Sequence, residues 1–220
     1  MTLADFLVPL PLVAVLRGIT PPEVAGVADA LSGAGFRILE VTLNSPQPFD
    51  SIRDLAARSG DACLVGAGTV IDPADVARVR EAGGRLVVMP HADPAVIREA
   101  KRQGLVCIPG VATPTEAFAA LAAGADALKM FPAEALPPAA LKAWRAVLPK
   151  STLVFAVGGM RPDNLSPYWE AGADGFGTGS NLYKPGASAD AVRHAARAYA
   201  RGVAALPELE RTRGAALAGN

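Results

Sequence analysis

Short apolar runs alternate with alanine-rich amphipathic stretches along almost the whole chain. Eight runs of three to six residues, most of them rich in Val, Ile and Leu, are each followed by a stretch with helical periodicity. The runs cover residues 13–16, 38–43, 63–66, 86–89, 106–108, 127–131, 153–157 and 175–178. A strand that is apolar at successive positions is buried on both faces, which is typical of a parallel sheet covered by crossover helices.

The amphipathic stretches carry the usual start and stop signals of helices. Several begin at a capping residue and a proline, as in Thr20-Pro21 and Asp72-Pro73, and several end at a glycine, as in Ala34-Gly35. Eight strand–helix units predict an α/β protein built as a single (β/α)8 barrel, the TIM-barrel fold. We expect the barrel over residues 1–206 and a C-terminal tail over 207–220. A doubly wound open sheet is the alternative.

The composition fits one domain with a large core and excludes several classes of partner. The chain has 220 residues, of which 51% are hydrophobic and 19% charged, and its formal net charge is zero. Without a basic surplus, neither nucleic acid nor an anionic membrane is expected as a partner. The charged fraction lies below the usual ~25%, which suggests that some surface is buried against another subunit.

The N-terminus and the cysteines favour a cytoplasmic protein. Residues 1–5 lack the basic flank and long apolar run of a signal peptide, and every apolar run ends before it could span a bilayer. Cys63 and Cys107 lie in separate apolar runs and are interpreted as reduced core residues. His91 and His194 form no metal-ligand pattern.

Lys129 is the residue with the clearest chemical implication. It lies inside the apolar run 127–131, whereas the other four lysines fall in helical or loop-like stretches. Burial favours the neutral form of an amine, and a neutral amine is a nucleophile. The structural alternative is an amine that reaches the solvent at the rim of the barrel.

Glu40 is the only acidic residue inside an apolar run. Active groups of such barrels lie at the C-terminal ends of the strands, and both Glu40 and Lys129 come late in theirs. A buried amine together with a buried carboxylate suggests Schiff-base chemistry with an acid/base partner. The alternative for Glu40 is an ion pair with a buried Arg.

Other strand ends offer ligand contacts. Arg17 ends the first run and could grip a carboxylate with two hydrogen bonds, although it could instead cap a helix or pair with Glu40. Thr69 follows a glycine-rich end of the third run and offers a hydroxyl.

Glycine-rich loops end the last two runs, as Val157-Gly158-Gly159 and Gly177-Thr178-Gly179-Ser180. Bare backbone N–H groups of two such loops commonly hold a phosphate in barrels of this kind. We therefore predict a phosphorylated ligand, with mere tight turns as the alternative. The loops by themselves do not identify the reaction, because many unrelated barrels share them.

These residues together resemble the family of 2-keto-3-deoxy-6-phospho-sugar-acid aldolases, class I enzymes of the Entner–Doudoroff type. The resemblance runs from about Leu10 to Ala205. It rests on the combination of four motifs, 39–43 (Leu-Glu-Val-Thr-Leu), 66–70 (Gly-Ala-Gly-Thr-Val), 128–132 (Leu-Lys-Met-Phe-Pro) and 157–159 (Val-Gly-Gly).

The resemblance implies a role for each candidate residue. It makes Lys129 the Schiff-base lysine and Glu40 the general acid/base, and it places Thr69 against the pyruvate moiety. It also implies that the phosphate is bound by the last two loops, through Gly158, Gly159, Gly179 and Ser180. No metal or other cofactor is implied, and a homotrimer is expected.

The family has two branches whose 6-phospho substrates are C4 epimers, and the motifs favour the galactonate branch. That branch typically has an Arg at the end of the first strand and an Asn-Ser-Pro sequence after the second, as Arg17 and Asn44-Ser45-Pro46 are here. The expected reaction is reversible cleavage of 2-dehydro-3-deoxy-6-phospho-D-galactonate to pyruvate and D-glyceraldehyde 3-phosphate. The sequence Phe131-Pro132-Ala133-Glu134, by contrast, is more similar to the gluconate branch.

Three alternatives remain open at this point. The first is the gluconate epimer as substrate, or both epimers. The second is a phosphate-binding barrel isomerase or decarboxylase, which shares the glycine loops but needs no strand lysine. The third is a non-catalytic sugar-phosphate-binding protein, which has no reason to bury both Lys129 and Glu40.

Overall fold

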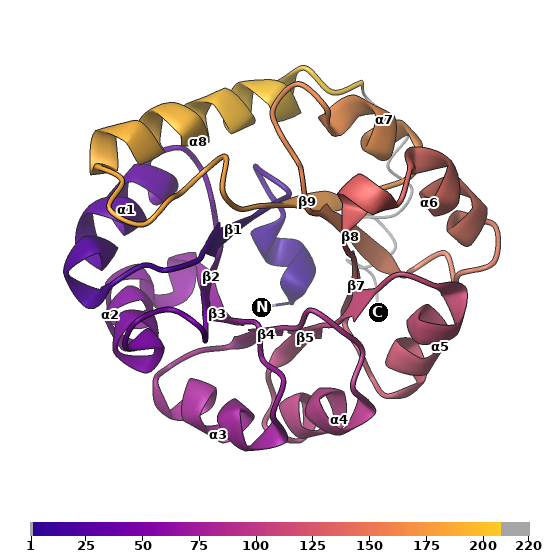
Figure 1. Cartoon of the computed structure of the whole chain (residues 1–220), viewed down its shortest axis with the longest axis horizontal. Coiled ribbons are helices and arrows are strands. Elements are labelled where there is room, and N and C mark those ends of the chain that lie inside the picture. The colour runs from indigo at the N-terminus through magenta and orange to yellow at the C-terminus, as the bar shows by residue number, and fades with distance from the viewer. Residues whose placement is uncertain (1, 208–220) are drawn as a thin grey trace.

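The strands run parallel and follow one another around a ring, and the α-helices lie outside it (Figure 1). The structure is a computed structural model, and it describes residues 2–207. The strands are β1 (Leu12–Leu16), β2 (Ile38–Thr42), β3 (Leu64–Gly68), β4 (Leu86–Val88), β5 (Val106–Ile108), β6 (Gly110–Val111), β7 (Ala127–Met130), β8 (Leu153–Val157) and β9 (Gly175–Thr178). The main helices are α1 (Val24–Ser32), α2 (Pro48–Ser59), α3 (Pro73–Glu81), α4 (Pro94–Arg102), α5 (Pro114–Ala122), α6 (Pro138–Arg145), α7 (Leu165–Glu170) and α8 (Ala189–Ala204).

The order of the strands identifies a barrel and contradicts the doubly wound alternative. Neighbours in the sheet are consecutive in the chain, and β1 also pairs with β9. An open doubly wound sheet would instead reverse its strand order at a switch point. All eight predicted strands are present. The third lies further along than expected, at Leu64–Gly68 instead of 63–66.

The fifth predicted strand, 106–108, is β5, and a further short strand that the sequence did not predict, β6, follows it after Pro109. A proline has no N–H to donate to the neighbouring strand. Its carbonyl oxygen still accepts from the Lys129 N–H at 2.8 Å, and the Cys107 carbonyl accepts from the Asp126 N–H at 3.0 Å. Because β5 pairs with β4 and β6 pairs with β7, these two short strands complete the ring.

One end of the barrel is filled by the N-terminal segment. The short 3-10 helix η1 (Leu3–Phe6) packs Leu3 and Phe6 onto the apolar residues that line the interior. Arg37, which comes just before β2, donates hydrogen bonds to the carbonyl oxygens of Asp5 and Val8. The N-terminal segment therefore closes the barrel at the N-terminal ends of the strands. The opposite end stays open for a ligand.

The structure also bears on the cysteines, on membrane-spanning helices and on metal binding. Cys63 and Cys107 are buried and form no disulfide. Among the described residues, no helix has the length and apolar character needed to cross a membrane. The same residues contain no cluster of His, Cys, Asp and Glu that could hold a metal ion. The predicted tail lies outside the described residues from position 208 onward.

Candidate active site

Strand geometry turns Lys129 into the barrel. Successive side chains of a strand point to opposite faces. Leu128 and Met130 belong to the core between strands and helices, whereas Ala127 belongs to the interior cluster. Lys129 shares the inward face with Ala127, and it is 7% exposed.

The same alternation turns Glu40 inward. Leu39 and Val41 pack against the helices, and Ile38 belongs to the interior cluster. Glu40 is 1% exposed, and together with Lys129 it lines a small apolar space in the middle of the barrel. Two side chains that are 89 positions apart in the sequence thus meet in one interior.

A larger cavity, which we call the mouth cavity, opens above this space, at the C-terminal ends of β1, β7, β8 and β9. Its volume is about 610 Å³, which is the size of a typical small-molecule site. Lys129 lines both spaces and joins them. The lining also includes five other candidates from the sequence, namely Arg17, Gly158, Gly159, Gly179 and Ser180.

Lys129 has the environment of a nucleophilic amine. Burial lowers its pKa, the Glu40 carboxylate opposes that shift, and the Arg17 charge reinforces it, with a lower pKa as the net result. In the part of the chain that the structure describes, Nζ has no hydrogen-bond acceptor, and it lies 4.6 Å from the centre of the Phe131 ring. A larger fraction of this amine is therefore neutral at neutral pH than for an ordinary lysine.

Glu40 has the environment of a general base. Burial raises the pKa of its carboxyl group, and the charges of Lys129 and Arg17 hold part of that rise back. Its buried Oε2 has no hydrogen-bond partner among the described residues, so no ion pair with Arg17 occupies it. A Cβ atom on Gly68 would lie only 2.6 Å from Glu40 Oε1, so this glycine makes room for the carboxylate.

The loops around the cavity mouth hold Arg17 in place. The N–H of Gly18 donates to Ser45 Oγ at 2.8 Å, which ties the end of β1 to the loop after β2. Gly18 has a φ of +81°, and a Cβ atom there would lie 2.6 Å from Pro185 Cγ. Only glycine fits this conformation and this close approach.

Both glycine loops reach the cavity. Gly158 and Gly159 have φ values of +107° and +66°, which favour glycine, and a Cβ atom on Gly158 would meet the Ala133 backbone nitrogen at 3.1 Å. Gly179 and Ser180 follow β9 on the same side of the cavity. Bare backbone therefore borders the mouth, as an anion-binding site requires.

Thr69 is set apart from this group. It follows β3 with a φ of +60°, a left-handed conformation that few non-glycine residues adopt. It is not among the residues that line the mouth cavity. Its contact with a ligand stays a prediction. The strained backbone supports a functional role, because such conformations gather at functional sites.

Sequence reasoning missed a second set of lining residues, in the loop after β9. They are Asn181, Tyr183, Lys184 and Pro185, and they are joined by Glu134, which the sequence analysis named only as a feature of the gluconate branch. Glu134 lies against the glycine loop after β8, since a Cβ atom on Gly159 would be 2.9 Å from its Oε2. Their position in the sequence could have identified residues 181–185 as site residues. They directly follow the last glycine loop, and barrel enzymes build their sites from the loops at this end of the strands.

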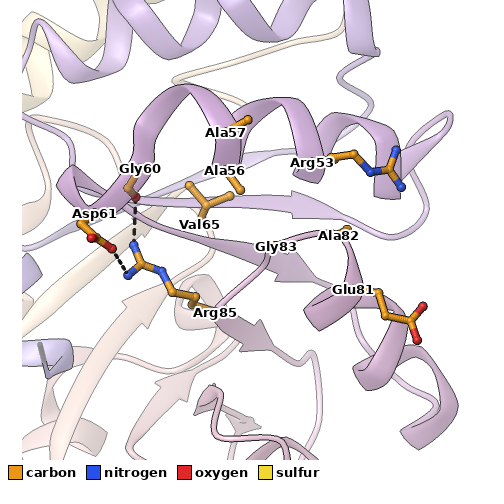
Figure 2. Close-up of a pocket in the computed structure, with 10 residues that line it drawn as sticks. All are labelled: Arg53, Ala56, Ala57, Gly60, Asp61, Val65, Glu81, Ala82, Gly83 and Arg85. Carbon is orange, nitrogen blue, oxygen red and sulfur yellow. Dashed lines mark hydrogen bonds and ion pairs between the residues drawn. The ribbon is translucent and has the colours of Figure 1, made fainter.

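A second hollow, of about 420 Å³, lies at the N-terminal ends of β3 and β4. Figure 2 shows Arg85 pointing toward Asp61 and Gly60 there, and it donates to the Asp61 carboxylate at 2.9 Å and to the Gly60 carbonyl at 3.0 Å. Arg53, on another side of the hollow, pairs with Asp50 at 2.6 Å. The Arg85 contacts tie the start of β4 to the loop before β3, the Arg53 pair lies within α2, and neither Lys129 nor Glu40 lines this hollow.

The comparisons with known proteins agree on one family. A family model described as "KDPG and KHG aldolase" matches residues 4–196. The chain is 51% identical over 186 residues to a Rhizobium meliloti (strain 1021) protein named "Probable 2-dehydro-3-deoxy-6-phosphogalactonate aldolase", covering 84% of this chain and 88% of the relative. It is 46% identical over 192 residues to the Escherichia coli (strain K12) "2-dehydro-3-deoxy-6-phosphogalactonate aldolase", covering 87% of this chain and 94% of the relative.

Solved structures extend the likeness to the fold. The structure titled "Native KDPGal structure" has a TM-score of 0.88 and 44% identity, and it covers 93% of this chain and 98% of its own. The comparisons of sequence and of fold therefore indicate the same family. The chain belongs to the KDPG and KHG aldolase family, whose members are lyases.

Proposed function

We propose that this protein is a class I aldolase that cleaves 2-dehydro-3-deoxy-6-phospho-D-galactonate reversibly to pyruvate and D-glyceraldehyde 3-phosphate. The observation that carries the proposal is the shared interior of Lys129 and Glu40, beneath a cavity bordered by two glycine loops. An isomerase, a decarboxylase or a binding protein of the same fold has no use for both buried groups.

Lys129 performs the first step. Its neutral amine adds to the C2 carbonyl of the substrate, and loss of water gives an iminium ion. The positive nitrogen then serves as the electron sink for the bond between C3 and C4. Burial favours this step because it lowers the pKa of Lys129 and so increases the neutral, nucleophilic fraction of the amine.

Glu40 performs the proton transfer. Its carboxylate removes the proton of the C4 hydroxyl, directly or through a water molecule, and the C3–C4 bond breaks. The electron pair of that bond forms an enamine on the Lys129 side, and glyceraldehyde 3-phosphate leaves. Protonation of the enamine at C3 and hydrolysis of the iminium then release pyruvate and restore the amine.

The other residues orient the substrate. Arg17 and Thr69 are assigned to its polar groups at the pyruvate end, and the two loops with Gly158, Gly159, Gly179 and Ser180 are assigned to its phosphate. Binding energy from the phosphate, remote from the reacting carbons, holds the substrate in the orientation that the reaction needs.

The galactonate epimer is favoured by Arg17 and Asn44, which both line the cavity. Relatives at 51% and 46% identity also carry that substrate in their names. Glu134, at the same cavity, supports the alternative that the gluconate epimer is also accepted.

The test of this proposal is pyruvate release from the two purified epimers, measured in parallel. We expect a clear preference in kcat/KM for the galactonate epimer. Equal or reversed preference would retain the aldolase and remove the epimer assignment. If neither epimer gave pyruvate, and if borohydride trapped no pyruvate on Lys129, the aldolase proposal would be wrong.

Gly68→Ala is expected to lower kcat/KM by roughly 10²-fold, because a misplacement of about 1 Å at a catalytic group costs that much. The new Cβ would lie 2.6 Å from Glu40 Oε1 and would push the carboxylate aside. Steady-state kinetics measure the loss. The control is Gly26→Ala in α1, where the nearest atom to the new Cβ is 3.2 Å away and no activity should be lost. Wild-type activity in Gly68→Ala would show that Glu40 tolerates displacement.

We also propose a cytoplasmic homotrimer. The low charged fraction of the chain and the exposure of the large apolar side chains Ile71, Phe118 and Val147 support burial of surface between subunits. Light scattering of the purified protein tests the trimer, since a monomeric mass would contradict it.

A further inference from the structure

Glu23 joins two loops of the cavity mouth that lie far apart in the sequence. Its Oε1 accepts a hydrogen bond from the Tyr183 hydroxyl at 3.0 Å and another from the Gly186 N–H at 2.9 Å. Its Oε2 accepts from the Thr20 N–H at 2.8 Å and from the Thr20 hydroxyl at 2.6 Å. One carboxylate thus holds the loop between β1 and α1 against the loop between β9 and α8.

The link is a strong one because the carboxylate stays ionised. Burial raises the pKa of Glu23, but the hydrogen bonds from Thr20, Gly186 and Tyr183 outweigh it and leave the pKa below its usual value. Burial and the neighbouring carboxylate raise the pKa of the Tyr183 hydroxyl, so it keeps its proton and remains a donor. Hydrogen bonds to a charged acceptor are about twice as strong as neutral ones.

Both linked loops carry residues that line the mouth cavity. The first loop follows Arg17, and the second contributes Ser180, Tyr183 and Lys184. The two loops also touch directly, where Pro185 packs onto the backbone of Gly18. The cationic side chains that line this cavity are Arg17, Lys129 and Lys184, and two of the three belong to or adjoin the linked loops.

We infer that Glu23 is a positioning residue for the phosphate end of the substrate. Its carboxylate holds the loop after β9 so that Ser180 and Lys184 face the phosphate, at a fixed distance from the end of the substrate that Arg17 contacts. This inference rests on the proposed function, because it assumes a substrate that carries a phosphate. Glu23 touches neither the substrate nor the reacting atoms and acts only through the loop.

A purely structural role for Glu23 is the competing explanation. Thr20 and Glu23 form a capping box at the start of the helical segment that leads into α1. The same box recurs at the start of α5, where Glu116 accepts from the Thr113 N–H at 2.9 Å and from the Ala112 N–H at 2.7 Å. Neither Thr113 nor Glu116 lines the mouth cavity. The chain therefore contains its own matched control.

The experiment compares Glu23→Gln with Glu116→Gln in the full-length protein. For Glu23→Gln we expect KM for the phosphorylated substrate to rise roughly tenfold, as for one lost charged hydrogen bond, with kcat within about twofold. Inhibition by inorganic phosphate should weaken by a similar factor. Glu116→Gln should leave KM and phosphate inhibition unchanged, although it also lowers the midpoint of thermal unfolding.

Tyr183→Phe separates the link from the cap, because it removes one donor to Glu23 and leaves the Thr20 contacts intact. We expect it to raise KM several-fold, and to add little when combined with Glu23→Gln, since both remove the same link. If Glu23→Gln and Tyr183→Phe lowered stability but left KM and phosphate inhibition unchanged, the positioning role would be refuted.

The proposed function is tested separately in the same preparations. Borohydride trapping of pyruvate on Lys129 does not need the phosphate site, and it should be the same in wild type, Glu23→Gln and Glu116→Gln. Loss of trapping in the wild type would refute the aldolase proposal. Normal trapping with an unchanged KM would refute only the role of Glu23.

Discussion

Lys129→Met is expected to reduce kcat by roughly 10⁵- to 10⁶-fold, as for the loss of other covalent nucleophiles. Methionine keeps an unbranched side chain of similar length but cannot form the iminium ion. Without that electron sink, the C3–C4 bond has no low-energy route to cleavage. Turnover assays and mass spectrometry after treatment with pyruvate and borohydride measure the effect, and the variant should gain no adduct.

The fold should survive this substitution. The amine has no hydrogen-bond acceptor among the described residues, so its removal breaks no hydrogen bond and loses only the contact with the Phe131 ring and the attraction of Glu40. Without the Lys129 charge the pKa of the buried Glu40 rises further, and a protonated carboxyl group is tolerated in the apolar interior, so the midpoint of thermal unfolding should change little. Lys142→Met, at an exposed position of α6, serves as the control and should be fully active. Substantial turnover by Lys129→Met would exclude the Schiff-base assignment.

Glu40→Gln is expected to slow cleavage by roughly 10²- to 10⁴-fold, the usual contribution of a general acid/base. The amide has nearly the same shape as the carboxylate but cannot take the proton of the C4 hydroxyl. Single-turnover cleavage of the phosphorylated substrate isolates this step. Pyruvate trapping by borohydride should be retained, because adduct formation depends on Lys129. An unchanged rate would make Glu40 a structural residue.

Glu40 and Lys129 together are expected to determine how the activity depends on pH. Burial raises the pKa of Glu40, so its carboxylate is lost by protonation at a higher pH than for an ordinary glutamate. Burial lowers the pKa of Lys129, so its neutral amine is available at a lower pH than for an ordinary lysine. Activity should therefore fall as the pH drops through the raised pKa of Glu40. Glu40→Gln should remove that part of the profile, which kcat/KM across pH would show.

The fold could be predicted from the sequence because each strand is apolar at successive positions and each helix has its own boundary signals. The short strand β6 after Pro109 was not predicted, because the apolar run was taken to end at Ile108 and two residues after a proline show no strand pattern of their own. Closure depends on the carbonyl oxygens of Cys107 and Pro109, which accept from residues near β7. Such pairings between distant strands leave no local pattern.

Only part of the candidate site could be predicted, because its residues differ in how clearly they stand out from the local sequence. Lys129 and Glu40 violate the apolar pattern of their strands, so each is conspicuous by itself. Tyr183 and Lys184 lie in the loop after β9, where a charged or aromatic residue is unremarkable. Glu23 reads as an ordinary capping residue, and only the packing of two loops brings Gly186 to within 2.9 Å of its carboxylate.

The sequence by itself determined the alternation of strands and helices, the two buried ionisable groups and the glycine loops. These are properties of local segments, because burial and backbone freedom act on each residue where it stands. The tertiary structure alone decided that Lys129 and Glu40 share one interior, that Thr69 stands apart from the mouth cavity, and that Glu23 links its two loops. Those are distances between segments that are remote in the chain, and they follow from how the closed barrel packs as a whole.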